Sequence, residues 1–295
     1  AVIRIITKKR AGEGIGFDNK TVARHRTAYG WSVYDQLNLN YRKKGFDLSG
    51  MLYAGNFRGG TDNTYIIDTY LDKHWQQYLD LRDQTSKTQS LETTWSLNYQ
   101  FDENHAMGIR YNFERTPQYY GYLNQFAQSY CNKELYEDLY STIISDDPET
   151  YHRSNFYYNG KVKNWSIDFN ADGLWSDTKN TQTAKEDIKE GANEDSDRTV
   201  TTFNTNKNEL YAAKLVLSHP FGKGELSFGA EYSHNKRNTT YFNKEGIIED
   251  NQAMIKEGAA SAFIEYAKAF NQVQMQLGLR YEHVGFDYYD AGKLV

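Results

Sequence analysis

The sequence predicts an all-β fold in which antiparallel strands form part of a transmembrane β-barrel. Three observations predict it. Segments of strict apolar–polar alternation recur along the chain, as expected for strands with two different faces. The connections between these segments are short and long in turn, which is typical of outer-membrane barrels. Aromatic residues make up 15% of the chain, yet no apolar run of about 18 residues could form a membrane-spanning helix.

The composition excludes several classes of function. The 295 residues carry a net charge of −5, so the sequence lacks the basic surface expected of a nucleic-acid-binding protein. Cys131 is the only cysteine, which excludes an internal disulfide and a cysteine-rich metal site. The seven histidines are dispersed, and no Gly-x-Ser-x-Gly motif is present. We therefore expect no metal, no other cofactor and no enzymatic activity.

The clearest element is a hairpin over residues 91–113. Alternation places apolar and aromatic side chains on one face: Leu91, Trp95, Leu97, Tyr99 and Phe101, then Met107, Ile109, Tyr111 and Phe113. The other face carries charged, amide and hydroxyl side chains. Residues 102–105, Asp-Glu-Asn-His, have the composition of a turn, so the segment is predicted to be strand, turn and strand.

Similar units follow one another along the chain. Residues 15–23 alternate as one strand, and further hairpins are predicted over these ranges: 33–54, 156–171, 213–232 and 260–281. This gives about 10–11 meandering strands. Single-chain bacterial barrels close with an even number of strands, so we expect the missing strands to follow Val295.

The long connections between hairpins are predicted to contain some structure of their own. Two of them have apolar residues at every fourth position: Ile67, Leu71, Trp75 and Leu79 in one, and Leu135, Leu139 and Ile143 in the other. This spacing predicts short amphipathic helices, the first over about residues 68–82. Residues 176–208 are polar with almost nothing to bury, so we expect that segment to be mobile.

The two faces of the strands predict their surroundings. A sheet in lipid has to close, because every backbone amide needs a partner within the protein. The apolar face would then meet the acyl chains, and the polar face would line the interior. The residues expected to face inward are Gln36, Asn38, Asn40, Thr94, Ser96, Asn98, Arg110, Asn112, Ser166, Asp168, Asn170, Ser227, Glu231, Gln276, Arg280 and Glu282. Aromatic residues near the short turns are expected at the level of the headgroups.

Two segments resemble a known family. Residues 1–9, Ala-Val-Ile-Arg-Ile-Ile-Thr-Lys-Lys, resemble the end of the plug domain of TonB-dependent outer-membrane receptors, although Arg4 stands where Asn is usual. Residues 278–283, Gly-Leu-Arg-Tyr-Glu-His, resemble a mid-barrel strand of the same receptors. The two segments lie near opposite ends of the chain, with the predicted hairpins between them. The resemblance therefore extends over nearly the whole chain. The strand-rich, Tyr-rich sequence is similar to those of receptors from Bacteroidota-like bacteria.

The resemblance implies a domain division and a function. Residues 1–10 would be the end of the plug domain and a linker, and residues 11–295 the N-terminal part of a barrel of about 22 strands. It implies active uptake of a bulky, scarce nutrient (a siderophore, a corrinoid or an oligosaccharide) through the outer membrane of a Gram-negative bacterium. The expected partners are outer-membrane lipid, the nutrient at the extracellular loops, the TonB complex acting through a plug before Ala1, and a surface lipoprotein.

Three tyrosines in a long loop are candidate ligand-binding residues. Tyr119, Tyr120 and Tyr122 could stack on a sugar or on an aromatic chelate. Two alternatives to an energy-coupled receptor remain open. A passive porin-like or adhesive barrel would keep the strands without the energy coupling. A soluble all-β glycan-binding module would cover apolar residues such as Leu97 and Ile109 with a second sheet.

Overall fold

The computed structural model describes residues 12–189, 196–271 and 273–295, and it is built from strands. Residues 1–10, assigned by sequence to the end of a plug domain, lie outside the described residues. The strands are β1 Gly14–Arg26, β2 Gly30–Lys43, β3 Phe46–Gly60, β4 Asn63–Tyr70, β5 His74–Gln100, β6 His105–Cys131, β7 Glu134–Asp146, β8 Glu149–Val162, β9 Trp165–Lys189, β10 Ser196–Phe221, β11 Gly224–Asn243, β12 Asn251–Phe270, β13 Val273–Asp290 and β14 Lys293–Leu294.

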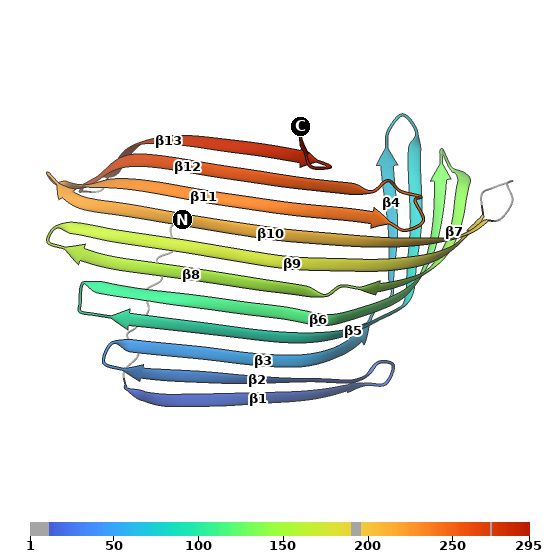
Figure 1. The fold of residues 1–295 in the computed structure, drawn as a ribbon, viewed down its shortest axis with the longest axis horizontal. Helices are drawn as coiled ribbons and strands as arrows, with labels where there is room; N and C mark the ends of the chain where they lie inside the picture. The colour runs from blue at the N-terminus through green and yellow to red at the C-terminus, as the bar shows by residue number, and fades with distance from the viewer. Residues whose placement is uncertain (1–11, 190–195, 272) are drawn as a thin grey trace.

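All fourteen strands belong to one antiparallel sheet, drawn in Figure 1. When β4, β7 and the two-residue β14 are set aside, eleven long strands remain, and each pairs with the next along the chain. This arrangement confirms the predicted all-β meander. β1 and β13 lie at opposite ends of this path and face no long strand on their outer sides within the described ranges.

The short turns predicted within the five hairpins lie at one end of the sheet (Figure 1). Short turns also occur at the other end, at residues 27–29 and 132–133, so short and long connections are only partly separated. Four of the turns within the five hairpins contain residues with positive φ, which a tight hairpin turn requires: Lys44 and Gly45, Lys163, Gly222, and Asn271. Lys44 and Gly45 both have positive φ (45° and 81°), the pattern of a type I′ turn. The twist of that turn matches the twist of the strands it joins.

The predicted helices are wrong: the described residues form no helix. Residues 68–82 belong to β4, a turn and the start of β5, and Leu139 and Ile143 lie on β7. A spacing of four does not distinguish the two structures, because positions four apart share a face in a strand as well as in a helix. No described helix is therefore long and apolar enough to cross a membrane.

The long connections are mostly continuations of the strands. β5 and β6 have 27 residues each, β9 has 25 and β10 has 26. β4 pairs with residues 74–81 of β5, while β7 fills the space between the far parts of β6 and β9. Most of the segment expected to be mobile, residues 176–208, is thus paired strand, apart from residues 190–195, which are not described.

We call this far part of the sheet the crown; it consists of β4, β7 and the adjoining ends of β5, β6, β9 and β10. In Figure 1 the β4 and β7 hairpins stand at a steep angle to the other strands. The pairing of β5 with β6 is irregular between Arg82 and Thr85 and between Gln89 and Leu91. Asp83, with φ of 55°, lies in the first irregularity. Such bulges bend a strand, so they account for the change of direction.

The part of the sheet beside the short turns, which we call the band, has one apolar face. Directly opposed residues of antiparallel strands share a face, and Leu48, Leu97, Ile109, Phe156 and Ala171 are opposed in succession from β3 to β9. Within the described residues no second layer covers this face, and Ile109 is 50% exposed. The soluble module, which needs such a layer, is therefore not supported.

Aromatic side chains line the band at its short-turn end. The rings of Tyr99 and Phe101 lie 4.8 Å apart, and Trp165 lies 4.7 Å from His219. Other pairs are Tyr41 with Phe46 and Phe221 with Tyr266. This agrees with the expected aromatic ring at one membrane interface.

Candidate ligand-binding surface

The polar face of the band carries a continuous row of side chains able to meet a solute. The residues of this row, each opposed to the next, are Gln36, Tyr53, Glu92, Glu114, Tyr151, Ser176, Asn208 and Arg237. We call them the polar row. They project to the side opposite Leu97 and Ile109, which is the interior if the apolar face meets lipid.

Much of the polar row is held by its own hydrogen bonds. Arg153 Nη1 lies 2.5 Å from Glu114 Oε1, and its guanidinium lies 5.3 Å from the centre of the Tyr151 ring. Asn208 donates to Ser176 Oγ at 3.0 Å, and Ser176 is only 1% exposed. This half of the row is therefore a fixed wall with its charges compensated.

At the other end of the row, three rings form an aromatic patch: Tyr34, Tyr53 and Phe57. Their centroids are 5.6, 5.9 and 6.4 Å apart, with planes 14° to 36° from parallel. The three rings converge over Gly55, where a Cβ would lie 2.6 Å from Phe57 Cε2 and 3.1 Å from Tyr34 Cβ. A side chain at position 55 would displace them.

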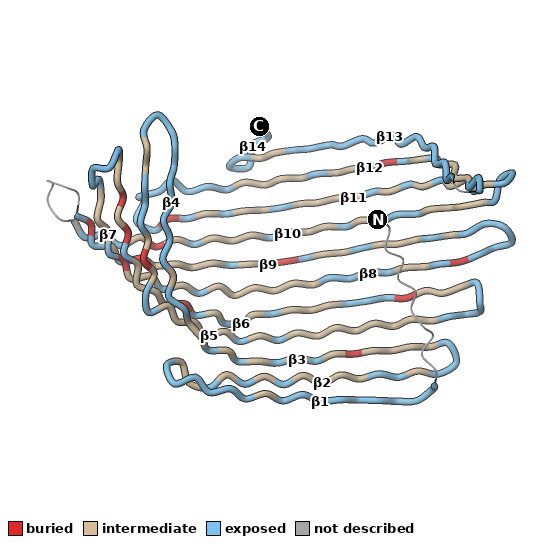
Figure 2. Tube along the Cα trace, turned by 180° about the vertical axis from the view of Figure 1, so that it is seen from behind, coloured by how far each residue is buried: buried red, intermediate tan, exposed pale blue. Residues whose placement is uncertain are grey.

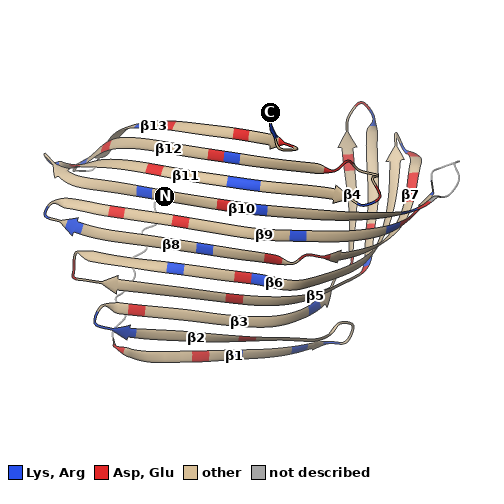
Figure 3. Ribbon diagram, viewed as in Figure 1, with Lys and Arg blue, Asp and Glu red and all other residues tan. Residues whose placement is uncertain are grey.

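A second feature of the interior wall is a small pocket with two guanidinium groups. Arg110 and Arg153 line a cavity of about 220 Å³ together with Asn155, Asp172 and others. Arg110 Nε donates to Asn112 at 3.2 Å, and Asn155 Nδ2 donates to Asp172 at 2.8 Å. Because carboxylates and amides surround the two cations, the pocket is mixed in charge. Figure 3 shows the same mixture of signs along the strands generally.

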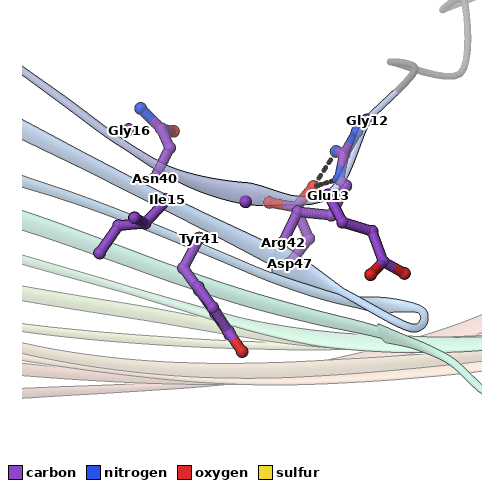
Figure 4. A pocket seen from close by; sticks show the side chains of 9 residues that line it. Gly12, Glu13, Ile15, Gly16, Asn40, Tyr41, Arg42 and Asp47 are labelled. Atoms are coloured by element: carbon purple, nitrogen blue, oxygen red, sulfur yellow. Dashed lines mark hydrogen bonds and ion pairs between the residues drawn. The ribbon is translucent and has the colours of Figure 1, made fainter.

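The pocket drawn in Figure 4 lies where residues 12–16 meet β2 and β3. Arg42 and Asp47 form an ion pair there, and Glu13 Oε1 accepts a hydrogen bond from the Lys44 N–H at 2.9 Å. Its charged side chains are thus engaged with each other and with the chain. We assign this pocket a structural role at the short-turn end.

The three candidate tyrosines lie on one strand, β6, but not on one face. Tyr119 lies on the interior side, and its ring passes beside Gly121. A Cβ added at Gly121 would lie 3.3 Å from Tyr119 Cε1. Tyr120 and Tyr122 lie on the opposite side; Lys87 Nζ is 5.9 Å from the ring of Tyr120, and Tyr122 donates to Asn124 at 3.1 Å. Strand alternation therefore prevents the three from meeting one ligand together.

The residues expected to face inward share the polar face. The hydroxyl group of Tyr157 on β8 donates a hydrogen bond to Asn98 Oδ1 on β5 at 2.9 Å. To reach it, the Tyr157 side chain passes over Gly108 of the intervening strand β6. Arg280 lies 3.3 Å from Glu231 and 3.2 Å from Glu282. The aromatic patch was not among the sequence-based candidates. Its signal was present, because Tyr34 and Tyr53 fall on the polar side of their alternating strands.

The part of the chain that the structure describes contains no candidate metal site. No group of three His, Cys, Asp or Glu side chains among those residues could hold an ion.

Residues 157–293 match the model of the outer membrane protein beta-barrel family. This match covers less than half of the chain, and together with the sheet it supports an outer-membrane protein of the β-barrel type. The matched segment begins within β8 and ends at β14, so it includes the second half of the band. The apolar outer face and aromatic interface described above have the membrane as their surroundings. No curated protein sequence matches the chain.

Several solved outer-membrane proteins are similar in structure. BauA, the ferric preacinetobactin receptor from Acinetobacter baumannii, is 8% identical, with a TM-score of 0.35, over 94% of this chain and 57% of its own. The protease OmpT from Escherichia coli is 9% identical, with a TM-score of 0.26, over 81% and 86%. The toluene transporter TodX from Pseudomonas putida is 8% identical, with a TM-score of 0.24, over 94% and 87%. The chain thus spans little more than half the length of the BauA receptor.

Proposed function

We propose that the chain is the barrel part of a TonB-dependent receptor that actively imports a bulky, scarce nutrient. The observation that supports this most is the polar wall of a wide, uncovered sheet. Eleven strands carry this wall, and neither outer strand has a long partner within the described ranges. Since a sheet in lipid must close, the proposed barrel has more strands and a large interior, as plugged outer-membrane transporters do.

The resemblance of residues 1–9 to the end of a plug supports energy coupling. A plug would fill the interior and leave no permanent channel. The nutrient would meet the polar wall and the crown, and the TonB complex would act through the plug. A passive porin-like barrel is the second candidate, because the same polar wall would also suit a water-filled channel.

Conductance of the full-length protein in planar lipid bilayers separates these two functions. A plugged receptor is expected to give no steady conductance at moderate voltage. A passive porin would give stable, ohmic steps. Steady conductance from the intact protein would contradict the receptor proposal and favour the passive channel. The protein's heat-dependent mobility on a gel serves as the control for correct folding before each recording.

A further inference from the structure

The aromatic patch is an open surface of three rings on the interior wall. Its centroids form a nearly equilateral triangle with sides of 5.6 to 6.4 Å. In a column of three stacked rings the two outer rings would be about twice as far apart as neighbouring rings. The three rings here are nearly equidistant, so they lie side by side as a patch. Tyr34, Tyr53 and Phe57 are each only partly exposed, and within the described residues no other element packs over them.

Polar side chains flank the patch on two sides. Gln36 is opposed to Tyr53 on one side, and Lys20 Nζ lies 5.9 Å from the centre of the Tyr34 ring. Glu92 is opposed to Tyr53 on the other side, where it accepts a hydrogen bond from Ser90 Oγ at 3.1 Å. Amide, hydroxyl and carboxylate groups therefore surround an apolar centre, the arrangement found in sites for small polar molecules.

Tyr119 extends this aromatic surface across the wall. Phe57 is opposed to Thr88, and Thr88 is opposed to Tyr119, so the two rings share a face and lie two strands apart. At the usual spacing of strands this is roughly 10 Å. A ligand that reaches both has more than one ring-sized unit. Thr88, between them, adds a hydroxyl group.

The chemistry of these groups favours a neutral, hydroxyl-rich ligand. Aromatic faces are electron-rich and attract the weakly positive C–H groups of a sugar ring. The flanking amide, hydroxyl and carboxylate can exchange hydrogen bonds with sugar hydroxyls. In the described part of the chain Glu92 forms no ion pair, and Glu114 is opposed to it. Arg153 compensates the carboxylate of Glu114, so of these two groups Glu92 leaves a negative charge beside the rings, which disfavours an anionic ferric chelate.

We propose that the patch of Tyr34, Tyr53 and Phe57, with Tyr119 beyond it, binds successive rings of a neutral oligosaccharide. This assignment rests on the proposed uptake function and names its substrate class. The stacking of each sugar ring on an aromatic face supplies affinity, and Gln36 and Glu92 orient the hydroxyl groups. Gly55 keeps the rings together, because any side chain there would separate them.

Binding of maltohexaose, cellohexaose and xylohexaose to the purified full-length protein tests the assignment by calorimetry. At least one hexasaccharide is expected to bind, and Phe57→Leu is expected to weaken it about tenfold. Leucine keeps an apolar side chain but removes the flat face. Tyr119→Ala should weaken binding, whereas Tyr120→Ala, on the opposite face of the same strand, should change it less than about twofold.

The assignment is overturned if none of the three sugars binds, or if Phe57→Leu and Tyr120→Ala weaken binding equally. Binding of a ferric catecholate in place of the sugars would also overturn it, while leaving the receptor function intact. Bilayer conductance decides that function separately, so failure of the subsite and failure of the receptor proposal are distinguishable. Heat-dependent gel mobility again shows that each variant is folded.

Discussion

The band and crown halves of β9 distribute polar and apolar side chains in opposite ways. In the band, Ile167 and Phe169 lie on the outer face, and Asp168 lies on the inner face. In the crown, Ala184 and Ile188 lie on that same inner face, where they are 7% and 2% exposed. The pairing of β9 with β10 is regular throughout, so no bulge explains the change.

The reversal shows that the surroundings, and not the strand, decide which face is apolar. Lipid covers the outer face of the band, so apolar groups lie there. We infer that the crown lies beyond the membrane, where water reaches both faces and the apolar side chains that are buried, such as Ala184 and Ile188, lie on the inner side. Figure 2 shows many of the buried positions in the crown. Trp175, whose ring lies 5.1 Å from His152, marks the change and the second membrane interface.

A charge on the outer face of the band is expected to have the largest effect. Phe169→Arg should lower the free energy of unfolding by about 2–4 kcal/mol, because arginine would lie in hydrocarbon. Asn170→Arg makes the same change in charge on the inner face and should cost less than about 1 kcal/mol. Urea unfolding in phospholipid vesicles measures both. Equal losses would contradict the assignment of the two faces.

Loss of an apolar group in the crown is expected to come next. Ile188→Ala removes a side chain that is 2% exposed, and it should destabilise the crown by about 2 kcal/mol. Asp187→Ala, on the outer face of the same strand, should stay within about 0.5 kcal/mol. Hydrogen exchange of the β7 and β9 amides reports this local stability. A larger effect at Asp187 would reverse the polarity assigned to the crown.

A methyl group at Gly108 should have a smaller effect on the band. Its Cβ would lie 2.4 Å from Asn98 Oδ1, which accepts the hydrogen bond of Tyr157. Gly108→Ala is therefore expected to cost about 1 kcal/mol. Gly258→Ala, with no atom within 4 Å of the new group, is the control. Urea midpoints that shift equally for both variants would show that this hydrogen bond has no special role.

A change of pH should have the smallest effect, and only at the crown. Burial raises the pKa of Asp147, which lies between β7 and β8 and accepts a hydrogen bond from Asn180. Its stabilising contribution is therefore complete below its ordinary pKa and is lost as the pH rises through the raised value. Asp147→Asn should remove this dependence from hydrogen exchange in β7. An unchanged pH profile in the variant would exclude Asp147 as its source.

The sequence predicts the band well, because lipid on one side and a polar interior on the other impose strict alternation. Leu97 and Ile109 are recognised in this way, as are the short turns at Lys44 and Lys163. The crown is not predicted, since spacing of four at Ile67, Trp75 and Leu79 fits strands and helices alike. The aromatic patch is not predicted either, because Gly55 unites rings from two strands.

Spin labels placed along β9 would test most directly that its polarity reverses at the membrane interface. Single cysteines would replace residues 165 to 187 in a Cys131→Ser background, and collisions with oxygen and with a water-soluble nickel complex would be compared in vesicles. We expect oxygen to dominate at positions 167, 169 and 171 and the nickel complex at 183, 185 and 187, with the change near Trp175. Oxygen dominance at all six positions would contradict the account.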